Sequence, residues 1–186
     1  HWHAMVSIAA IKAGKDVYCE KPLTLTIDEG KRLVSTAEIT SRVLQTGSQQ
    51  RSDARFRLAC ELVRNGRIGK LEKVHVHLPA GRHGGPFPSS EVPKDLDWEF
   101  WKGQTPDTNY VKERVHGSFR YWYDYSGGTM TDWGAHHNDI ALWGIGMERS
   151  GPVSVHGKPR TKMIPGGYNA ASEYEIQYSY ANGVRQ

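Results

Sequence analysis

The spacing of apolar residues predicts alternating helices and strands over the first third of the chain. Residues 3–13 repeat Ala, Val and Ile at helical spacing, and residues 16–19 are typical of a short buried strand. Thr26 and Glu29 have the spacing of a capping box, which predicts a second helix, and residues 43–46 predict a second strand. The side chains expected to face inward from the second helix are Ile27, Val34 and Ala37. Strands joined by helices indicate part of a buried parallel sheet.

The pattern changes after a third helix, which is expected to begin at Asp53 and to end at Asn65 and Gly66. Its apolar face is formed by Phe56, Ala59, Cys60 and Val63. Residues 71–78 then alternate between apolar and polar side chains, which predicts a strand with one face in solvent. The two faces are formed by Val74, Val76 and Leu78 and by Lys73, His75 and His77. This change of pattern places a domain boundary near residues 50–70.

The remainder of the chain predicts a long loop, a helix and an antiparallel sheet. Residues 79–117 are rich in proline and glycine but also in aromatic residues, so we expect a packed cover over a site. The aromatic anchors expected in this cover are Trp98, Phe100 and Trp101. A glycine pair at 127–128 leads into a helix, and residues 152–156 and 174–180 predict strands, the second followed by a hairpin turn. The exposed face of this open sheet, with residues such as Tyr174 and Ile176, predicts a homo-oligomer, either a dimer or a tetramer.

Composition narrows the class of protein. The chain has 186 residues, 38% of them hydrophobic and 24% charged, which is typical of a soluble globular protein. No apolar run approaches the roughly 18 residues that cross a bilayer, and the start of the chain lacks the regions of a signal peptide. We therefore expect a cytoplasmic protein with no membrane partner, while a leader upstream of residue 1 stays open. Cys19 and Cys60 lie in apolar segments and are expected to be reduced thiols. The formal net charge of +4 is spread along the chain, which argues against a nucleic-acid partner.

One helix carries a candidate acid–base pair. Asp132 and His136 are four residues apart, which places both side chains on one face of an α-helix. A carboxylate in that position can hold an imidazole in one orientation, as a general acid or base requires. The alternative is that Asp132 caps the helix and His136 is a hydrogen-bonded core histidine.

A candidate lysine follows the first predicted strand. Lys21 stands at the carboxyl end of that strand, where open α/β sheets bind their ligands, and Pro22 stiffens the turn. The alternative is a solvated surface lysine.

Pairs of histidines raise the question of a metal site. His136 and His137 are adjacent on a helix and point roughly 100° apart, so they need a third element to bind one ion. His75 and His77 share one face of a strand and could chelate a metal, but a solvent-exposed or partner-facing surface is the simpler interpretation. A metal-dependent hydrolase would need a further ligand that the sequence does not supply, so no metal is predicted.

Several motifs together resemble a known family. Glu20-Lys21-Pro22, the preceding His1-Trp2-His3, the glycine pair at 127–128 and Asp132-x-x-x-His136 resemble the glucose-fructose oxidoreductase and inositol dehydrogenase family (Gfo/Idh/MocA). The resemblance extends to residues 47–51 and 119–122. It implies a two-domain, NAD- or NADP-dependent dehydrogenase that acts on a hydroxyl of a sugar, cyclitol or related polyol. Residues 1–52 would be the C-terminal part of a Rossmann-type parallel sheet, and residues 53–186 part of a substrate-binding and oligomerisation α/β domain with a largely antiparallel open sheet.

The resemblance also implies roles for individual residues. Lys21, Asp132 and His136 correspond to the catalytic group, with His136 as the proton acceptor, and all three would also contact substrate. The residues that would contact the cofactor are His1, Trp2, His3, Glu20, Lys21, Pro22 and Gln49. Trp122 would form a wall of the substrate pocket, and His137 would be a further substrate contact.

One expected motif lies outside the chain. The Gly-x-Gly-x-x-Gly phosphate loop and the acidic residue that selects between NAD and NADP would precede residue 1, and the hairpin at 181–183 has only a short returning arm. We therefore expect a fragment that is inactive on its own. A competing interpretation is a non-catalytic carbohydrate-binding or assembly module on the same fold, but the retention of Lys21, Asp132 and His136 argues against it.

Overall fold

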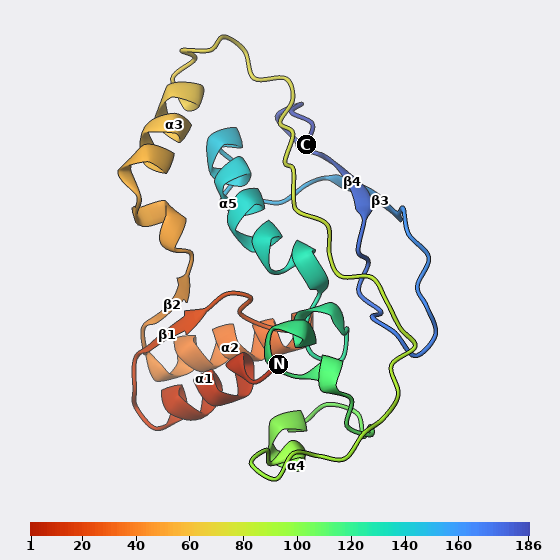
Figure 1. The fold of residues 1–186 in the computed structure, drawn as a ribbon. Coiled ribbons are helices and arrows are strands. Elements are labelled where there is room, and N and C mark those ends of the chain that lie inside the picture. The colour runs from red at the N-terminus through yellow and green to blue at the C-terminus, as the bar shows by residue number, and fades with distance from the viewer.

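The computed structural model describes residues 1–186, and its first elements form a small parallel α/β unit. These elements are α1 (His3–Lys12), β1 (Val17–Glu20), α2 (Ile27–Thr40) and β2 (Leu44–Gly47). β1 and β2 pair in parallel, with Val17 opposite Leu44 and Glu20 opposite Gly47. α1 and α2 pack against each other and lie together beside the two strands (Figure 1). The predicted helix–strand alternation is therefore confirmed.

The second helix has the predicted start but a different buried face. The Thr26 hydroxyl accepts a hydrogen bond from the Glu29 amide at 3.2 Å, and the Glu29 carboxylate accepts one from the Thr26 amide at 3.1 Å. Ile27 is 81% exposed and Val34 is 53% exposed, whereas Leu33 is fully buried. The predicted inward face was therefore wrong for Ile27 and Val34, whereas Ala37 is half-buried beside the face that carries Leu33. Hydropathy alone does not show which apolar side of a helix its neighbours cover.

The third helix connects the first unit to the rest of the molecule. The short 3₁₀ turn η1 (Gln49–Ser52) leads into α3 (Ala54–Arg64), and the Asp53 carboxylate caps that helix. α3 packs along α5 (Trp133–Ile145), and the buried Cys60 thiol donates to the Ile140 carbonyl oxygen at 3.7 Å. Burial raises the pKa of this thiol, which is consistent with the predicted reduced, packed cysteine.

The strand predicted over residues 71–78 does not form. The segment is extended and keeps its alternation, with Val74 half-buried and its polar neighbours exposed, but it makes only one isolated bridge, between Lys73 and Arg185. A strand needs a neighbour along its length to pair its backbone groups, and these residues find a single pairing position. Side-chain alternation alone therefore overpredicted regular structure here.

The loop after this segment is a packed cover, as predicted. It contains α4 (Trp98–Lys102) and the 3₁₀ turns η2 (Lys112–Arg114) and η3 (His116–Tyr121). A cluster of buried side chains holds it together: Trp98, Tyr110, Val115, Trp122, Tyr125 and Tyr168. Trp101 packs against this cluster, but Phe100 is 70% exposed and is not the anchor that was expected.

The last part of the chain places a second sheet beside the central helix. η4 (Gly128–Met130) precedes α5, which Gly146 ends in a left-handed conformation, and β3 (Ser154–Pro159) pairs antiparallel with β4 (Tyr174–Ser179). α5 runs between α3 and this sheet (Figure 1). The returning arm of the predicted hairpin is present, because the Tyr180 amide donates to the Val184 carbonyl oxygen at 3.0 Å.

The exposed side of the second sheet differs from the expected one. Every residue of β3 is exposed, including Val155 at 59%, whereas Tyr174 and Ile176 of β4 are half-buried. Pairing of subunits through this sheet stays a prediction. No helix of the structure combines the length and the apolar character that crossing a membrane would require.

Candidate functional site

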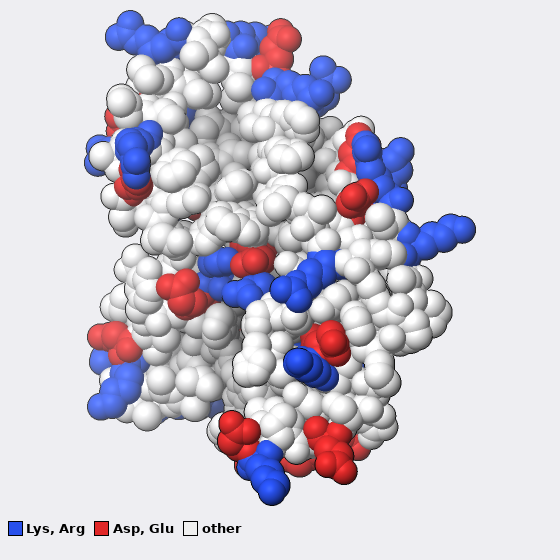
Figure 2. Space-filling model, viewed as in Figure 1, with Lys and Arg blue, Asp and Glu red and all other residues white.

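Lys21 and Asp132 meet although 111 residues separate them in the sequence. The Lys21 ammonium donates to Asp132 Oδ1 at 2.7 Å and to the Asp132 carbonyl oxygen at 3.0 Å. The side chains are 16% and 21% exposed, so the pair is largely shielded from solvent. Figure 2 shows basic and acidic side chains together near the middle of one face, over the start of α5. The alternative of a solvated surface lysine is therefore wrong.

Asp132 stands at the N-terminus of α5 but does not cap it. Its backbone has φ −86° and ψ −89°, and its side chain makes no capping hydrogen bond. The second carboxylate oxygen, Oδ2, lies 3.4 Å from the Nε of Arg120 instead. The carboxylate is thus shared by two cations, Lys21 from the first unit and Arg120 from the cover.

His136 lies one turn into α5 and is 7% exposed. Burial is the main cause that lowers the pKa of its imidazole, and the Lys21 ammonium lowers it further, while Asp132 acts in the opposite direction. The ring is therefore neutral near pH 7. No hydrogen bond joins it to the Asp132 carboxylate, because Asp132 is outside the helix and its carboxylate faces Lys21 and Arg120. The predicted carboxylate–imidazole hydrogen bond was wrong, although all three side chains share one site.

The turn that carries Lys21 lies where the two parallel strands end. Glu20 and Gly47 are register partners, so both strand ends reach the same edge of the sheet. A Cβ at position 47 would fall 2.8 Å from the Glu20 carboxylate, so a larger residue there would require the Glu20 side chain to move aside. Gln49 is exposed just beyond this edge, in η1. Glu20, Pro22 and Gln49 therefore surround the edge at which open α/β sheets bind ligands.

The first three residues join this edge to the cover. The ring of His3 is hydrogen-bonded through Nδ1 to the Pro22 carbonyl oxygen at 2.8 Å. The Trp101 carbonyl oxygen is 2.8 Å from His1 Nε2 and accepts from the Trp2 indole at 3.1 Å. His1 and His3 line a cavity of about 290 Å³, whereas Trp2 packs against the cover.

Hydroxyl groups line the same cavity. They belong to Thr24, Thr26, Tyr123, Tyr125, Ser126 and Thr131. Trp122, the expected pocket wall, is not among the lining residues, because its ring is 3% exposed within the aromatic core. Its indole donates to the Glu113 carbonyl oxygen at 2.9 Å, and the Arg114 guanidinium lies 4.1 Å from its ring centre. Tyr123, the next residue, lines the cavity instead.

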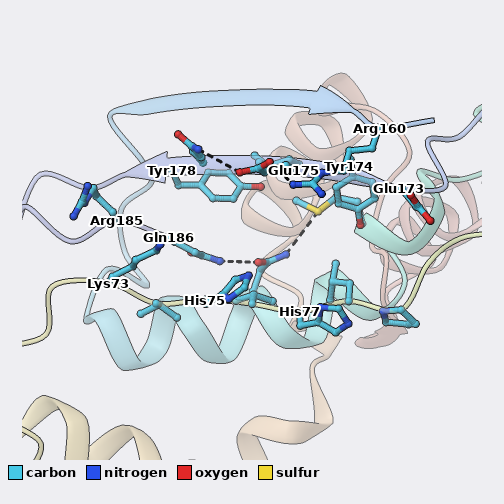
Figure 3. A pocket seen from close by; sticks show the side chains of 18 of the residues that line it. Lys73, His75, His77, Arg160, Glu173, Tyr174, Glu175, Tyr178, Arg185 and Gln186 are labelled. Atoms are coloured by element: carbon cyan, nitrogen blue, oxygen red, sulfur yellow. Dashed lines mark hydrogen bonds and ion pairs between the residues drawn. The ribbon is translucent and has the colours of Figure 1, made fainter. Parts of the chain in front are cut away.

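A larger cavity of about 820 Å³ lies elsewhere, between residues 73–80, β4 and α5 (Figure 3). It contains His75 and His77 on one wall and Tyr174 and Tyr178 on the other, and none of the three candidate catalytic residues lines it. His77 meets His137 only through its carbonyl oxygen, 3.4 Å from His137 Nδ1. No group of three histidine, cysteine, aspartate or glutamate side chains is arranged to hold a metal ion.

A second ion pair ties the first unit to α5 further along the helix. Arg51 donates from Nε and Nη2 to the two carboxylate oxygens of Asp139, at 2.7 and 2.9 Å. Its guanidinium lies 5.2 Å from the ring centre of Trp143. This pair fixes the rotation of α5 relative to η1, and hence the direction of Asp132 and His136.

Family models match both parts of the molecule. The model of the GFO_IDH_MocA oxidoreductase family described as its C-terminal alpha/beta domain matches residues 80–186, and the one described as its NAD-binding Rossmann fold matches residues 1–48. The chain belongs to the Gfo/Idh/MocA oxidoreductase family. The predicted resemblance and the predicted fold class, a Rossmann-type unit followed by an α/β domain, are both confirmed.

Individual relatives of this Gfo/Idh/MocA chain are dehydrogenases. Inositol 2-dehydrogenase 3 of Saccharopolyspora erythraea is 43% identical over 105 residues, which cover 53% of this chain and 31% of the relative. Myo-inositol 2-dehydrogenase of Thermotoga maritima is 40% identical over 68 residues, which cover 37% of this chain and 20% of the relative. The WlbA dehydrogenase from Chromobacterium violaceum, solved with NADH and UDP-GlcNAcA, has a TM-score of 0.67 at 20% identity and shows the shared fold over 98% of this chain and 44% of its own. The chain thus spans less than half the length of these relatives.

The sequence patterns do not assign partners to two arginines of this Gfo/Idh/MocA chain. Arg51 and Arg120 both lie in segments that carry the family resemblance, but no pattern predicts what either side chain contacts. Arg51 follows the second strand closely, so the rule that ligands and charges gather at strand ends could have indicated it. Nothing local indicates Arg120, because only the path of the cover brings it to Asp132.

Proposed function

We propose that the intact protein is an NAD- or NADP-dependent dehydrogenase that oxidises a hydroxyl of a sugar, a cyclitol or a related polyol. The observation that carries the proposal is the contact of Lys21 with Asp132 across the two parts of the chain, one turn from the neutral His136. The named relatives, which include inositol dehydrogenases, support a polyhydroxylated substrate. In this proposal residues 1–52 serve the cofactor and residues 53–186 the substrate, a division consistent with the two matched segments.

The edge formed by β1 and β2 suits the nicotinamide end of a dinucleotide. Both strands end there side by side, and the glycine at 47 lets the Glu20 carboxylate lie close to the backbone of the neighbouring strand. We assign the cofactor contacts at this edge to the turn at Glu20, Lys21 and Pro22, with Gln49. The segment His1, Trp2 and His3 would approach from the other side, where His1 and His3 border the smaller cavity. When bound, the nicotinamide would supply the hydride acceptor.

Lys21 would hold the reacting oxygen. An ammonium group has three donors, and two of the Lys21 donors are engaged by Asp132, which leaves one for a substrate hydroxyl. This donor would stabilise the negative charge that develops on the oxygen as its proton leaves. Asp132 would fix the direction of that donor, so its role is to orient and to neutralise.

His136 would accept the proton. Burial and the nearby ammonium keep the imidazole neutral, which is the form that a general base needs near pH 7. Its ring makes no hydrogen bond to a protein side chain, so a nitrogen is available to the substrate. We assign further substrate contacts to Tyr123, which lines the smaller cavity, and to His137, which follows His136 on α5.

A screen of sugars and cyclitols on the intact protein tests this function. Reduced nicotinamide absorbance is followed with NAD and with NADP, first for the wild type and then for His136→Asn. We expect turnover with at least one polyol, and a fall in kcat of about 10²- to 10⁴-fold in the variant, the range typical of a lost general base. His156→Asn, which changes an exposed histidine of β3, is the matched control and should keep wild-type turnover.

The outcomes separate the competing functions. Binding of a polyol without any turnover would favour a non-catalytic binding module. Full turnover in His136→Asn would show that another group accepts the proton.

A further inference from the structure

The carboxylate of Asp132 is held from two sides by residues of different segments. Lys21 donates to Oδ1 at 2.7 Å, and Arg120 Nε lies 3.4 Å from Oδ2. Each oxygen therefore has its own cation. Because the carboxylate is mostly shielded from solvent, losing one of these partners would leave an oxygen that must find another donor.

Arg120 is itself held in place by the cover. Its Nη1 donates to the Gly117 carbonyl oxygen at 3.1 Å, and its guanidinium lies 5.4 Å from the ring centre of Phe119. The residue after it, Tyr121, accepts hydrogen bonds at its carbonyl oxygen from the amides of Asn169 and Ala170. The backbone on which Arg120 stands is thus connected to the packed aromatic core.

The backbone of Asp132 does not turn its carboxylate toward α5. An N-cap aspartate normally has an extended backbone, which lets its side chain accept hydrogen bonds from amides in the first helical turn. Asp132 stands at the N-cap position of α5 with φ −86° and ψ −89°, which is not extended, and its side chain makes no such bond. The carboxylate is therefore oriented by its two cations and not by the helix.

We propose that Arg120 is a positioning residue that holds Oδ2 of Asp132 and thereby keeps Oδ1 directed at Lys21. The cover, whose 3₁₀ turn η3 carries Arg120, thereby acts on the reacting group as well as enclosing it. The expected effect of Arg120 on kcat rests on the proposed dehydrogenase function. Its expected effect on the position of the Asp132 carboxylate does not.

The geometric test is a crystal structure of the protein carrying Arg120→Gln. We expect the Asp132 carboxylate to rotate about its side-chain bonds, with its Oδ1 beyond hydrogen-bond distance of Lys21 Nζ. An Asp132 side chain that stays at the wild-type distance from Lys21 would overturn the proposal. This readout does not depend on a substrate, so it decides the question even if the intact protein oxidises no polyol.

The kinetic test uses Arg120→Gln and Arg120→Lys in the intact protein. We expect Arg120→Gln to lower kcat about 10- to 100-fold, as small misplacements of reacting groups do, with little change in the KM for the cofactor. Arg120→Lys keeps the positive charge and should recover part of that loss. If Arg120→Gln does not fold, Arg120→Lys alone must show an intermediate kcat.

Arg82→Gln is the matched control. Arg82 is also part of the cover and contacts η3, through the Ser118 hydroxyl at 2.9 Å and the ring of Tyr121, but it makes no contact with Asp132. It should leave both kcat and the Asp132 geometry unchanged. An Arg120→Gln protein with wild-type kcat, or one with a low kcat and an unmoved Asp132, would show that Arg120 does not act through that carboxylate.

Discussion

Two ion pairs join the first unit of the molecule to α5, and they differ in kind. Lys21 meets Asp132 just before the helix, and Arg51 meets Asp139 seven positions later, about two turns along it. Both pairs are partly buried, and both connect residues that are far apart in the sequence. Only the first lies beside a neutral histidine.

The geometry of each pair indicates its role. Both carboxylate oxygens of Asp139 are engaged by Arg51, whose face is covered by Trp143, and the hydrogen bond to Asp139 raises the pKa of the guanidinium still further. That planar, bidentate contact suits a permanent structural link. Lys21 instead keeps one donor unused, which suits a group that must also contact a substrate. The Arg51–Asp139 pair thus holds α5 in place, and the Lys21–Asp132 pair leaves a donor for a substrate.

The largest difference between the pairs should appear in catalysis. We expect Lys21→Met to lower kcat/KM by about 10³-fold, because it removes the donor to the developing negative charge. Arg51→Met should lower it by less than about 10-fold, since the arginine acts only through the placement of α5. Steady-state kinetics of the two variants of the intact protein, on a substrate found in the screen, measure this contrast.

A conservative variant sharpens that comparison. Lys21→Arg keeps the charge but replaces a compact ammonium by a planar fork, so it should not restore the activity that Lys21→Met loses. Equal losses of kcat/KM in the Lys21 and Arg51 variants would mean that both pairs are structural. The distinction drawn from their geometry would then fail.

Replacing Arg51 should reduce stability more than replacing Lys21 does, which is the reverse of their order in catalysis. Arg51→Met leaves the Asp139 carboxylate without its two donors and uncovers Trp143, so we expect the free energy of unfolding to fall by about 2 kcal/mol. Lys21→Met should cost less, because the Asp132 carboxylate retains its second cation, Arg120. Urea unfolding followed by circular dichroism measures both values.

A double-mutant cycle controls for the loss of side-chain packing. Asp139→Asn combined with Arg51→Met should cost clearly less than the sum of the single variants, because the two residues act as one pair. Additive costs would show that Arg51 stabilises the fold through Trp143 alone. Arg57→Gln, at an exposed pair within α3, should leave the unfolding midpoint unchanged.

The sequence predicts the local elements of this molecule better than their long-range contacts. The capping box at Thr26 and Glu29 acts within one turn, so its residues determine the start of α2 on their own. The face that α2 buries depends on what packs against it, and Leu33 was missed for that reason. Residues 71–78 have the alternation of a strand, but a strand also requires a pairing partner that alternation does not reveal.

In the candidate site, too, local features can be predicted from the sequence better than long-range contacts. The meeting of Lys21 with Asp132 followed from the family resemblance, since no local pattern relates residues 111 positions apart. The hydrogen bond from Asp132 to His136 was expected from helical spacing, which fails because Asp132 lies just outside the helix. Arg120 and Trp122 depend on the path of the cover. One reaches the carboxylate and the other enters the aromatic core, and their sequence neighbourhood does not distinguish them.

The smallest expected effect is a pH dependence of stability from His136, and its sign follows from burial. Burial, reinforced by the Lys21 ammonium, lowers the pKa of the folded imidazole below the ordinary value of 6.5, against the opposing charges of Asp132 and Glu20. Above pH 6.5 the ring is neutral in both states and its contribution to stability is fully present. As the pH falls below that value the unfolded chain takes up the proton first, so this contribution is lost as the pH approaches and passes the folded pKa.

His136→Asn removes the pH-dependent contribution of this imidazole to stability. When the pH is lowered from about 7.5 to about 5, the free energy of unfolding should therefore fall more for the wild type than for the variant. The remaining eight histidines are common to both proteins, so taking the difference between their urea midpoints cancels the other histidines. A variant that loses more stability than the wild type on acidification would mean that the folded imidazole gains a proton readily. A histidine of that kind would be cationic in the site, and it could not be the neutral group that distinguishes the Lys21 pair from the Arg51 pair.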